Sequence, residues 1–240
     1  MGFIYRPAGR AKEYSEWAIN IAVGCEHGCQ YCYAPGCYKM SKESFFGGGV
    51  MKPGILDSID RELVAVKKKI KSGERVLFCF TSDPYQNDQV ASVTRGLLER
   101  FVEFEVPFQV LTKAGTRASK DFDLYRSTDA FGTTLTFSDE ARSRDIEPKA
   151  DLPGDRIKAL KMAKDFGIST WVSFEPVLSE SSVVELYYKT KDVVDLFKLG
   201  KVSRFPSDVK DWKAFGNRMV DLFESDGKSY YVKEDLRKFL

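Results

Sequence analysis

Three thiols stand close together near the start of the chain. Cys25, Cys29 and Cys32 fall within eight positions, with the spacing C-x3-C-x2-C. Clustered thiolates select zinc, copper(I) or iron–sulfur clusters, and an odd total of five cysteines is poorly suited to a set of disulfide bonds. The motif therefore predicts a metal or cluster site in a loop on which the three thiols converge.

The number of thiols helps to separate the metals. A structural zinc site takes four protein ligands, so zinc would also have to recruit His27, Cys37 or a distant thiol. An iron–sulfur cluster that keeps one iron without a protein ligand needs only three. His27, the single histidine of the chain, is expected to pack against the cluster or hydrogen-bond to it rather than to ligate it. Cys37 is expected to be a free thiol on the same loop.

An aromatic residue, Tyr31, stands directly before Cys32. Three cysteines with an aromatic residue before the last resemble the signature of the radical S-adenosylmethionine (radical SAM) superfamily. The resemblance implies a [4Fe-4S] cluster on Cys25, Cys29 and Cys32, S-adenosylmethionine on the open iron, and Tyr31 among the residues that contact the cofactor. It also implies reductive cleavage of S-adenosylmethionine to a 5′-deoxyadenosyl radical that abstracts hydrogen from a substrate, chemistry that the cofactor supplies and the protein positions.

The elements that must position this motif follow from the periodicity of the apolar residues, which predicts strands and helices in alternation. Strands are expected at 17–23, 75–81, 108–112, 131–137, 168–174 and 193–199. Helices are expected at 55–70, 93–104, 119–126, 155–166, 182–188 and 209–223. The tail, 229–240, is expected to add an edge strand and a short helix.

Six βα units imply parallel strands with right-handed crossovers, which suit an open doubly wound sheet or a partial barrel. The superfamily resemblance favours the second, an α/β fold with a partial (β/α)6 TIM-like barrel and outer helices. We expect a single radical SAM domain over residues 1–240, with a core at about 17–200 and a C-terminal helix and tail at 201–240.

Polar residues follow several of these strands, at the end where such folds place their chemistry. Ser82 or Asp83, after the second strand, would accept hydrogen bonds from the methionyl ammonium group of the cofactor. Lys113, after the third, would pair with its carboxylate or contact its ribose. Glu175, after the fifth, is expected to contact the cofactor or Lys198, because a buried carboxylate needs a partner.

Several short motifs taken together extend the resemblance. The segments 24–34, 81–86, 112–113, 147–148 and 175–177 resemble the radical SAM proteins related to spore photoproduct lyase, including small bacterial and phage-type members of unassigned substrate. The resemblance covers about residues 17–200. In that family a serine after the second strand and a lysine after the third contact the cofactor, which implies these roles for Ser82 and Lys113.

One position departs from the family pattern. Spore photoproduct lyase returns a hydrogen atom to its product from a thiol near the end of the second strand, two residues before the serine. Phe80 stands there in this chain, and the neighbouring Cys79 is expected to face the opposite side of the sheet because strand residues alternate. Thymine-dimer repair is therefore the less favoured activity, with Cys79 or Cys37 as the candidate hydrogen donors.

Three classes of function remain open from the residues. The first is a radical SAM enzyme that modifies or repairs a nucleic acid or nucleotide, the second is a radical SAM enzyme acting on a peptide or small metabolite, and the third is a non-enzymatic iron–sulfur or zinc protein that binds nucleic acid. Basic and aromatic residues expected near the open rim favour a nucleic acid. They are Lys113, Arg117, Lys120, Arg142, Arg144, Lys149, Lys198, Lys201 and Arg204, with Tyr33, Tyr38, Phe45 and Phe46.

Composition sets the remaining expectations. The chain has 240 residues and a net charge of +2 from 37 basic and 35 acidic side chains, so any nucleic-acid binding must come from a local patch. No run approaches the roughly 20 apolar residues of a membrane span, and the N-terminus lacks the features of a secretory signal. We expect a cytoplasmic protein, without a membrane partner, that receives electrons from a reductant such as flavodoxin or ferredoxin.

Overall fold

The computed structural model describes residues 2–240. Its strands are β1 (Ile4–Tyr5), β2 (Trp17–Ile19), β3 (Ala22–Val23), β4 (Val50–Met51), β5 (Val76–Phe78), β6 (Phe108–Thr112), β7 (Ala130–Thr134), β8 (Ser169–Val177), β9 (Leu196–Lys201) and β10 (Ser229–Val232). Its helices are α1 (Ala34–Cys37), α2 (Lys42–Phe46), α3 (Ile55–Lys67), α4 (Asp88–Glu103), α5 (Glu140–Ile146), α6 (Pro153–Asp165), α7 (Glu180–Thr190), α8 (Trp212–Ser225) and α9 (Glu234–Arg237), with 3₁₀ helices η1 (Gly9–Glu13) and η2 (Gly115–Leu124).

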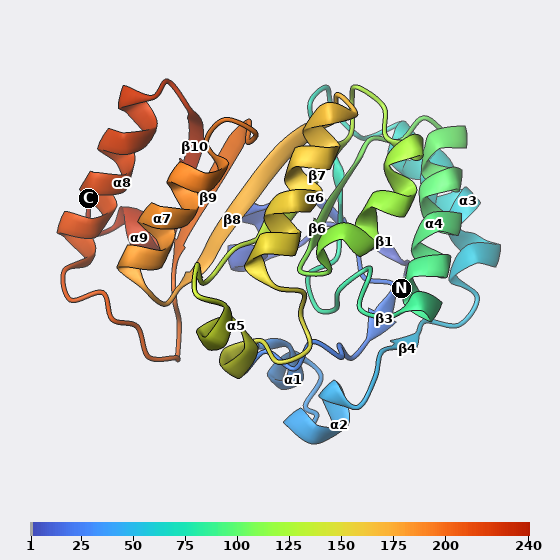
Figure 1. Cartoon of the computed structure of the whole chain (residues 1–240). Coiled ribbons are helices and arrows are strands. Elements are labelled where there is room, and N and C mark those ends of the chain that lie inside the picture. Colours follow the sequence, from blue (N-terminus) through green and yellow to red (C-terminus); the bar gives the residue numbers. More distant parts are fainter. Residues whose placement is uncertain (1) are drawn as a thin grey trace.

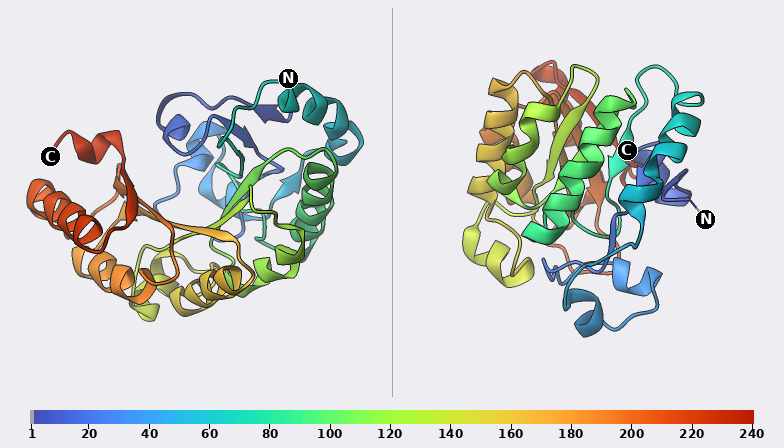
Figure 2. Two further views of the ribbon diagram at one scale, coloured as in Figure 1. Left: turned by 90° about the horizontal axis from the view of Figure 1, so that it is seen from above. Right: turned by 90° about the vertical axis from the view of Figure 1, so that its right-hand side faces the viewer.

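One curved sheet carries the architecture. Its strand order is β1-β2-β5-β6-β7-β8-β9-β10, and every neighbouring pair from β2 onward is parallel, whereas β1 runs antiparallel to β2. Helices lie along the outer side of the arc, which stays open between its first and last strands (Figure 2, left). The predicted partial barrel of six βα units is confirmed, and β10 with α9 forms the predicted edge strand and short helix.

Strand alternation divides the side chains between the two faces of the sheet. Phe78, Val110 and Val172 belong to the large core that packs against the helices. The inner face carries a much smaller apolar group, which includes Ala18 and Trp171. The inner face therefore combines this small apolar group with polar side chains such as Gln109 and Lys198, which both donate to the carbonyl of Tyr14.

The first predicted strand, 17–23, is corrected by the structure. Strand β2 ends at Ile19, and β3 pairs instead with β4 in a separate two-stranded sheet. Asn20 ends the regular pairing because its side-chain oxygen accepts hydrogen bonds from the N–H groups of Phe80 and Thr81, at 2.8 and 3.2 Å. The chain then turns out of the barrel sheet toward the cysteine motif.

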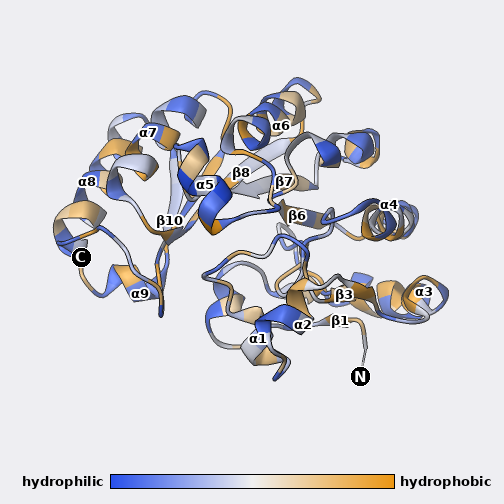
Figure 3. Cartoon of the chain, turned by 60° about the horizontal axis from the view of Figure 1, so that its bottom comes forward, coloured by the Kyte–Doolittle hydropathy of each residue, from blue (hydrophilic) through white to orange (hydrophobic). Residues whose placement is uncertain are grey.

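Other differences are local. The helix predicted at 119–126 is the 3₁₀ helix η2, and the strand predicted at 131–137 ends at Thr134. The short helices α1, α2 and α5 were not predicted, since four to seven residues leave little periodicity to detect. They gather at the lower end of the molecule (Figure 1), and the view from that end places them around the mouth of the barrel (Figure 3). Among residues 2–240, no helix combines the length and apolar character needed to cross a bilayer.

Candidate functional site

The cysteine motif lies in the loop between β3 and α1, at the carboxyl end of the barrel. Its shape depends on Gly24, which has a φ of +94° and sits against the backbone of the α2 segment. A Cβ atom on this residue would lie 2.6 Å from the carbonyl oxygen of Gly48. Only glycine combines that backbone conformation with so close an approach, so Gly24 allows the chain to enter the cysteine loop.

Three other segments brace the loop through its backbone. The N–H of Cys25 donates to the carbonyl of Phe45 at 3.0 Å, and the N–H of Gln30 donates to that of Ile146 at 2.9 Å. The side-chain oxygen of Gln86 accepts from the N–H of Glu26 at 2.8 Å. A loop held on three sides keeps its geometry without a ligand, which is the preorganisation that a cofactor site requires.

The electrostatic surroundings of the thiols combine burial with nearby positive charge and N–H groups. Burial raises the pKa of all three thiols, that of Cys29 to about 12. The backbone N–H groups of His27 and Ala34 oppose the rise at Cys25 and Cys32, and the cation of Lys113 opposes it at all three cysteines. Lys113 is therefore the cation that favours the thiolate form of the motif.

The arrangement was also compared with a single-metal site. Within residues 2–240, no group of three or more His, Cys, Asp or Glu side chains converges closely enough to hold one metal ion. A [4Fe-4S] cluster makes a different demand, because each thiolate binds a different iron atom. The three cysteines, their N–H contacts and the nearby cation are chemically suited to that group.

Asp83 lies buried at the centre of the site, with both carboxylate oxygens engaged by the protein. One oxygen accepts from the N–H of Tyr85 at 2.8 Å and from Thr112 Oγ1 at 2.7 Å. The other accepts from the N–H of Lys113 at 2.8 Å and lies 3.1 Å from His27 Nε2. Asp83 thus ties the ends of β5 and β6 to the cysteine loop, and His27 braces this loop from inside.

Ser82 differs from its neighbour. Its hydroxyl oxygen is buried and accepts no hydrogen bond among residues 2–240. Its O–H faces the thiol of Cys79 and opposes the rise in pKa that burial causes there. A buried acceptor that is left unused is uncommon and costs stability. Of the two residues predicted to receive an ammonium group, Ser82 has its acceptor capacity free, whereas that of Asp83 is largely used inside the protein.

Tyr31, half-buried beside the cysteines, is held from behind by a buried ion pair. Its hydroxyl donates to Glu147, which also accepts from Arg156 Nη2 at 2.6 Å. Both charged side chains are fully buried. Burial opposes ionisation of Glu147, but Arg156 and Lys113 outweigh it and lower the pKa of the carboxyl. The pair therefore remains ionic and fixes the position of Tyr31.

Glu175 is not paired with Lys198, which corrects one of the two predicted partners. Its Oε2 accepts from the hydroxyl of Tyr14 and from Lys233 Nζ, the latter at 2.6 Å. Lys233 follows β10, so its proximity depends on the fold of the tail. Lys198 Nζ donates instead to the backbone carbonyl of Tyr14 at 2.9 Å.

Lys198 has no carboxylate partner among the described residues and is only 7% exposed. Burial and the neighbouring cation of Lys233 lower the pKa of Lys198 to about 8. Acidic groups at Glu13 and Glu175 offset part of this shift. A buried lysine whose pKa is depressed destabilises the fold at every pH at which the free side chain is charged.

Replacing Lys198 with methionine is expected to raise the free energy of unfolding at pH 7 by about 1–3 kcal/mol, since one pKa unit corresponds to about 1.4 kcal/mol. The wild-type penalty is complete below pH 8 and declines as the pH rises from about 8 toward 10.5. Urea unfolding at pH 7 and at a pH near 10 measures the difference. The exposed Lys158→Met is the control and should change little; equal gains for Lys198→Met at both pH values would contradict the assignment.

The two candidate hydrogen donors lie in contrasting places. Cys79 is 5% exposed and packs in the outer core with Phe78, while Phe80 belongs to the inner group. Burial raises the pKa of Cys79 to about 12. Cys37 is exposed on α1. Neither placement tests the predicted role.

Only some of the residues predicted at the rim are exposed in the structure. Phe45 is fully buried, whereas Tyr33 is 60% exposed directly after Cys32. Lys198 lies inside the barrel. The remaining exposed cations of the predicted set are Lys120, Arg142, Arg144, Lys149 and Arg204, of which Arg142 and Arg144 form ion pairs with Asp208 and Glu140.

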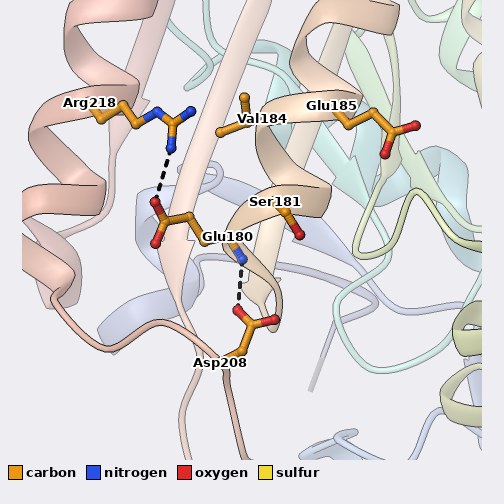
Figure 4. Close-up of a pocket in the computed structure, with 6 residues that line it drawn as sticks. All are labelled: Glu180, Ser181, Val184, Glu185, Asp208 and Arg218. Carbon is orange, nitrogen blue, oxygen red and sulfur yellow. Dashed lines mark hydrogen bonds and ion pairs between the residues drawn. The ribbon is translucent and has the colours of Figure 1, made fainter.

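A separate pocket of about 440 Å³ lies on the outside of the molecule, between α7 and α8. Glu180, Glu185, Asp208 and Arg218 contribute its charged groups (Figure 4). Arg218 pairs with Glu180 at 3.3 Å, and the N–H of Glu180 donates to Asp208 at 2.9 Å. The pocket lies away from the cysteine motif, and its cation, Arg218, is paired within it.

Sequence reasoning missed Tyr14, Arg156 and Lys233. Arg156 carried a usable signal, because it lies on the helical stripe that also contains Leu160 and Ala163, and that stripe is buried. No sequence signal marked Tyr14 or Lys233 as site residues, because both reach the site from segments outside the six βα units.

Comparison with protein-family models gave no match. Two curated relatives are uncharacterized proteins. One, from Acidianus two-tailed virus, is 29% identical over 186 residues, which cover 74% of this chain and 61% of the viral protein. The other, from Methanocaldococcus jannaschii, is 26% identical over 174 residues, which cover 71% of this chain and 64% of the archaeal protein. The chain thus spans less than two thirds of the length of either.

Solved structures match this chain over a larger share of its length than the sequence relatives do. Spore photoproduct lyase aligns with a TM-score of 0.73 at 15% identity, over 95% of this chain and 80% of the lyase chain. Streptococcus suis SuiB bound to S-adenosylmethionine aligns with a TM-score of 0.67 at 14% identity, over 90% of this chain and 46% of SuiB. At these identities the likeness concerns the fold.

Proposed function

We propose that this chain, which has the radical SAM fold found in spore photoproduct lyase, is itself a radical SAM enzyme. The observation that carries the proposal is the braced cysteine loop at the carboxyl end of the barrel, with three thiols on one loop and the cation of Lys113 at the neighbouring strand end. A site at this edge, built from several strand ends, is where folds of this type perform their chemistry.

Each residue is assigned a part by its surroundings. Cys25, Cys29 and Cys32 would hold the [4Fe-4S] cluster, and Ser82 would accept a hydrogen bond from the amino group of S-adenosylmethionine. Lys113 would pair with its carboxylate. When bound, cluster and cofactor would supply the reductive C–S cleavage that yields a 5′-deoxyadenosyl radical.

Two further side chains would shape the space around the cofactor. Tyr31, fixed by Glu147, presents its ring beside Lys113, whose Nζ lies 5.7 Å from the ring centroid. Glu175 is held by Lys233 on the opposite side of the barrel interior. We assign both residues to contacts with the cofactor.

The test is anaerobic. The protein is reconstituted with iron and sulfide, reduced with dithionite and mixed with S-adenosylmethionine, and 5′-deoxyadenosine is measured by chromatography. We expect it to form, with flavodoxin or ferredoxin able to replace dithionite. A protein that carries a full cluster and forms none, with or without oligonucleotides and peptides, would contradict the proposed enzyme and favour an iron–sulfur binding protein.

Replacing Lys113 with alanine is expected to weaken S-adenosylmethionine binding by about 10- to 100-fold, since an ion pair shielded from water is worth about 1.5–3 kcal/mol. Iron content should stay unchanged, because the lysine is not a cluster ligand. Equilibrium titration of the reconstituted protein measures the affinity, with the exposed Lys120→Ala as the matched control. Unaltered affinity would remove Lys113 from the site.

For the substrate we propose a nucleic acid or nucleotide. Tyr33 offers an exposed ring for base stacking beside the cluster loop, and Lys149 and Arg204 are exposed cations on loops at the same end of the barrel. Spore photoproduct lyase has been crystallised with a dinucleoside spore photoproduct, and SuiB with a precursor peptide. A peptide is therefore the second candidate, and whichever class accelerates 5′-deoxyadenosine formation decides between them.

A further inference from the structure

The segment between β1 and β2 crosses the open side of the partial barrel. Residues Gly9–Glu13, called the strap here, leave the β1 edge of the sheet and contact the opposite edge. Arg10 pairs with Asp235 and donates to Ser203 Oγ at 2.7 Å. Glu13 accepts from the N–H of Glu234 at 2.7 Å. The strap is thus anchored on the C-terminal tail.

Tyr14 follows the strap and points into the barrel. Its hydroxyl hydrogen-bonds to Ser173 Oγ at 2.7 Å and donates to Glu175, both on β8. Its backbone carbonyl accepts from Gln109 Nε2 on β6 at 3.1 Å and from Lys198 Nζ on β9 at 2.9 Å. Three strands that line the interior therefore hold this one residue.

The exposure of the inner side chains differs between the strands around Tyr14. Trp171, Ser173 and Lys198, on β8 and β9, are 2%, 0% and 7% exposed, and the Tyr14 and Trp171 ring centroids lie 6.1 Å apart. Leu111 on β6 is in register with Trp171 through Gly132 of β7, yet Leu111 is half-buried, as is Tyr14 itself. Tyr14 therefore lies against the inner face of β8 and β9, where the side chains are most deeply buried.

We infer that Tyr14, together with the strap, closes the open side of the partial barrel, so that substrate reaches the cofactor from the rim at the carboxyl ends. The inference rests on the proposed function. It makes Tyr14 a positioning residue that shields the interior from water on the open side of the sheet.

The physical need for such a cover follows from the chemistry. A carbon radical abstracts hydrogen from whatever lies nearest, and closing a reactive site against solvent suppresses side reactions. The sheet of the partial barrel stays open between its first and last strands, and the Tyr14 ring with its hydrogen bonds covers that opening. The same ties hold Oε2 of Glu175 and leave its other oxygen with only Arg10, at 4.0 Å.

The experiment compares Tyr14→Ala with Tyr14→Phe, both in a Trp212→Phe background that leaves Trp17 and Trp171 as the fluorophores. Acrylamide quenching reports access to Trp171. For the alanine variant we expect the quenching constant to rise at least about twofold and 5′-deoxyadenosine formation without substrate to rise about tenfold relative to product formed. Tyr14→Phe keeps the ring and should preserve the quenching constant. Tyr230→Phe, outside the barrel, is the control.

Each result has a consequence. Quenching that is equal in wild type and Tyr14→Ala overturns the inference that Tyr14 covers the interior, and increased quenching without a rise in unproductive cleavage overturns its role in the reaction. Absence of cleavage in wild type rejects the proposed function, while quenching still decides whether Tyr14 covers the interior. If Tyr14→Ala does not fold, Arg10→Ala combined with Glu13→Gln releases the strap, and the same measurements apply.

Discussion

The Cys29→Ala variant is expected to keep its fold and lose the cluster, and with it all formation of 5′-deoxyadenosine. Cys29 is 6% exposed in a loop whose backbone is held by contacts that do not involve its sulfur. Removing one sulfur should cost about 1 kcal/mol of stability. Losing one of three thiolates leaves an iron atom without its protein ligand. Iron and sulfide analysis, with circular dichroism and urea unfolding, measures both effects.

The matched control is Cys37→Ala. Cys37 is exposed on α1 and lies outside the C-x3-C-x2-C motif, so its removal should leave iron content and cofactor cleavage within about twofold of wild type. Global unfolding of Cys29→Ala would indicate that the metal site supports the fold itself. Retention of a full, active cluster would show that another residue supplies the ligand.

The second large effect is expected at Arg156. Replacing it with leucine should lower the free energy of unfolding by about 3–5 kcal/mol, because Glu147 would be left as a buried charge without its partner. Arg156 also donates to the carbonyls of Thr134 and Asp151, at 2.9 and 2.7 Å, and these acceptors would lose a donor as well. Urea unfolding at pH 7 measures the loss.

Two further variants help to interpret the loss of stability of Arg156→Leu. The double variant Glu147→Leu with Arg156→Leu should recover part of the stability, because no unpaired charge remains, although Tyr31 would lose its acceptor. Arg218→Leu removes a surface arginine that is 57% exposed and paired with Glu180, and it should cost no more than about 1 kcal/mol. Equal losses for Arg156→Leu and Arg218→Leu would contradict the importance of the buried pair.

The expected result at Arg156 connects the core to the site. Glu147 holds the hydroxyl of Tyr31, and the N–H of Lys149, two residues further on, donates to the carbonyl of His27 at 3.2 Å. A change in α6, which begins at Pro153, should therefore disturb the cysteine loop from a distance. Reduced cluster retention by Arg156→Leu would indicate that the cysteine loop is disturbed.

Much of the fold was predictable from local sequence. The six parallel strands and most of the helices appear near the expected positions because apolar residues alternate in the strands and recur at helical spacing between them. The cysteine motif could also be recognised in the sequence, since a metal or cluster site is predicted from residue type and spacing. Elements of four to seven residues, such as α1, α2 and α5, escaped because their position is decided by contacts with the rest of the molecule.

The individual strand ends were less predictable. Ser82 and Lys113 follow their strands as expected, and the structure leaves the acceptor capacity of the Ser82 hydroxyl unused. Asp83 has the same position in the sequence pattern, yet its oxygens accept hydrogen bonds at two strand ends and one lies 3.1 Å from His27 in the cysteine loop. Adjacent polar residues look alike in a sequence, whereas only the packing around them decides which one is satisfied.

The sequence by itself determined the α/β class and the succession of strands and helices along the chain, and it predicted a cluster site on the three clustered thiols, because periodicity and residue type act over short stretches of chain. Only the tertiary structure decided which side chains meet inside the barrel. Tyr14 comes from before the first parallel strand and Lys233 from after the last, and both contact Glu175. Such contacts form between residues far apart in the chain, where the closure of the fold and the shape of its core, rather than any local pattern, set the distance.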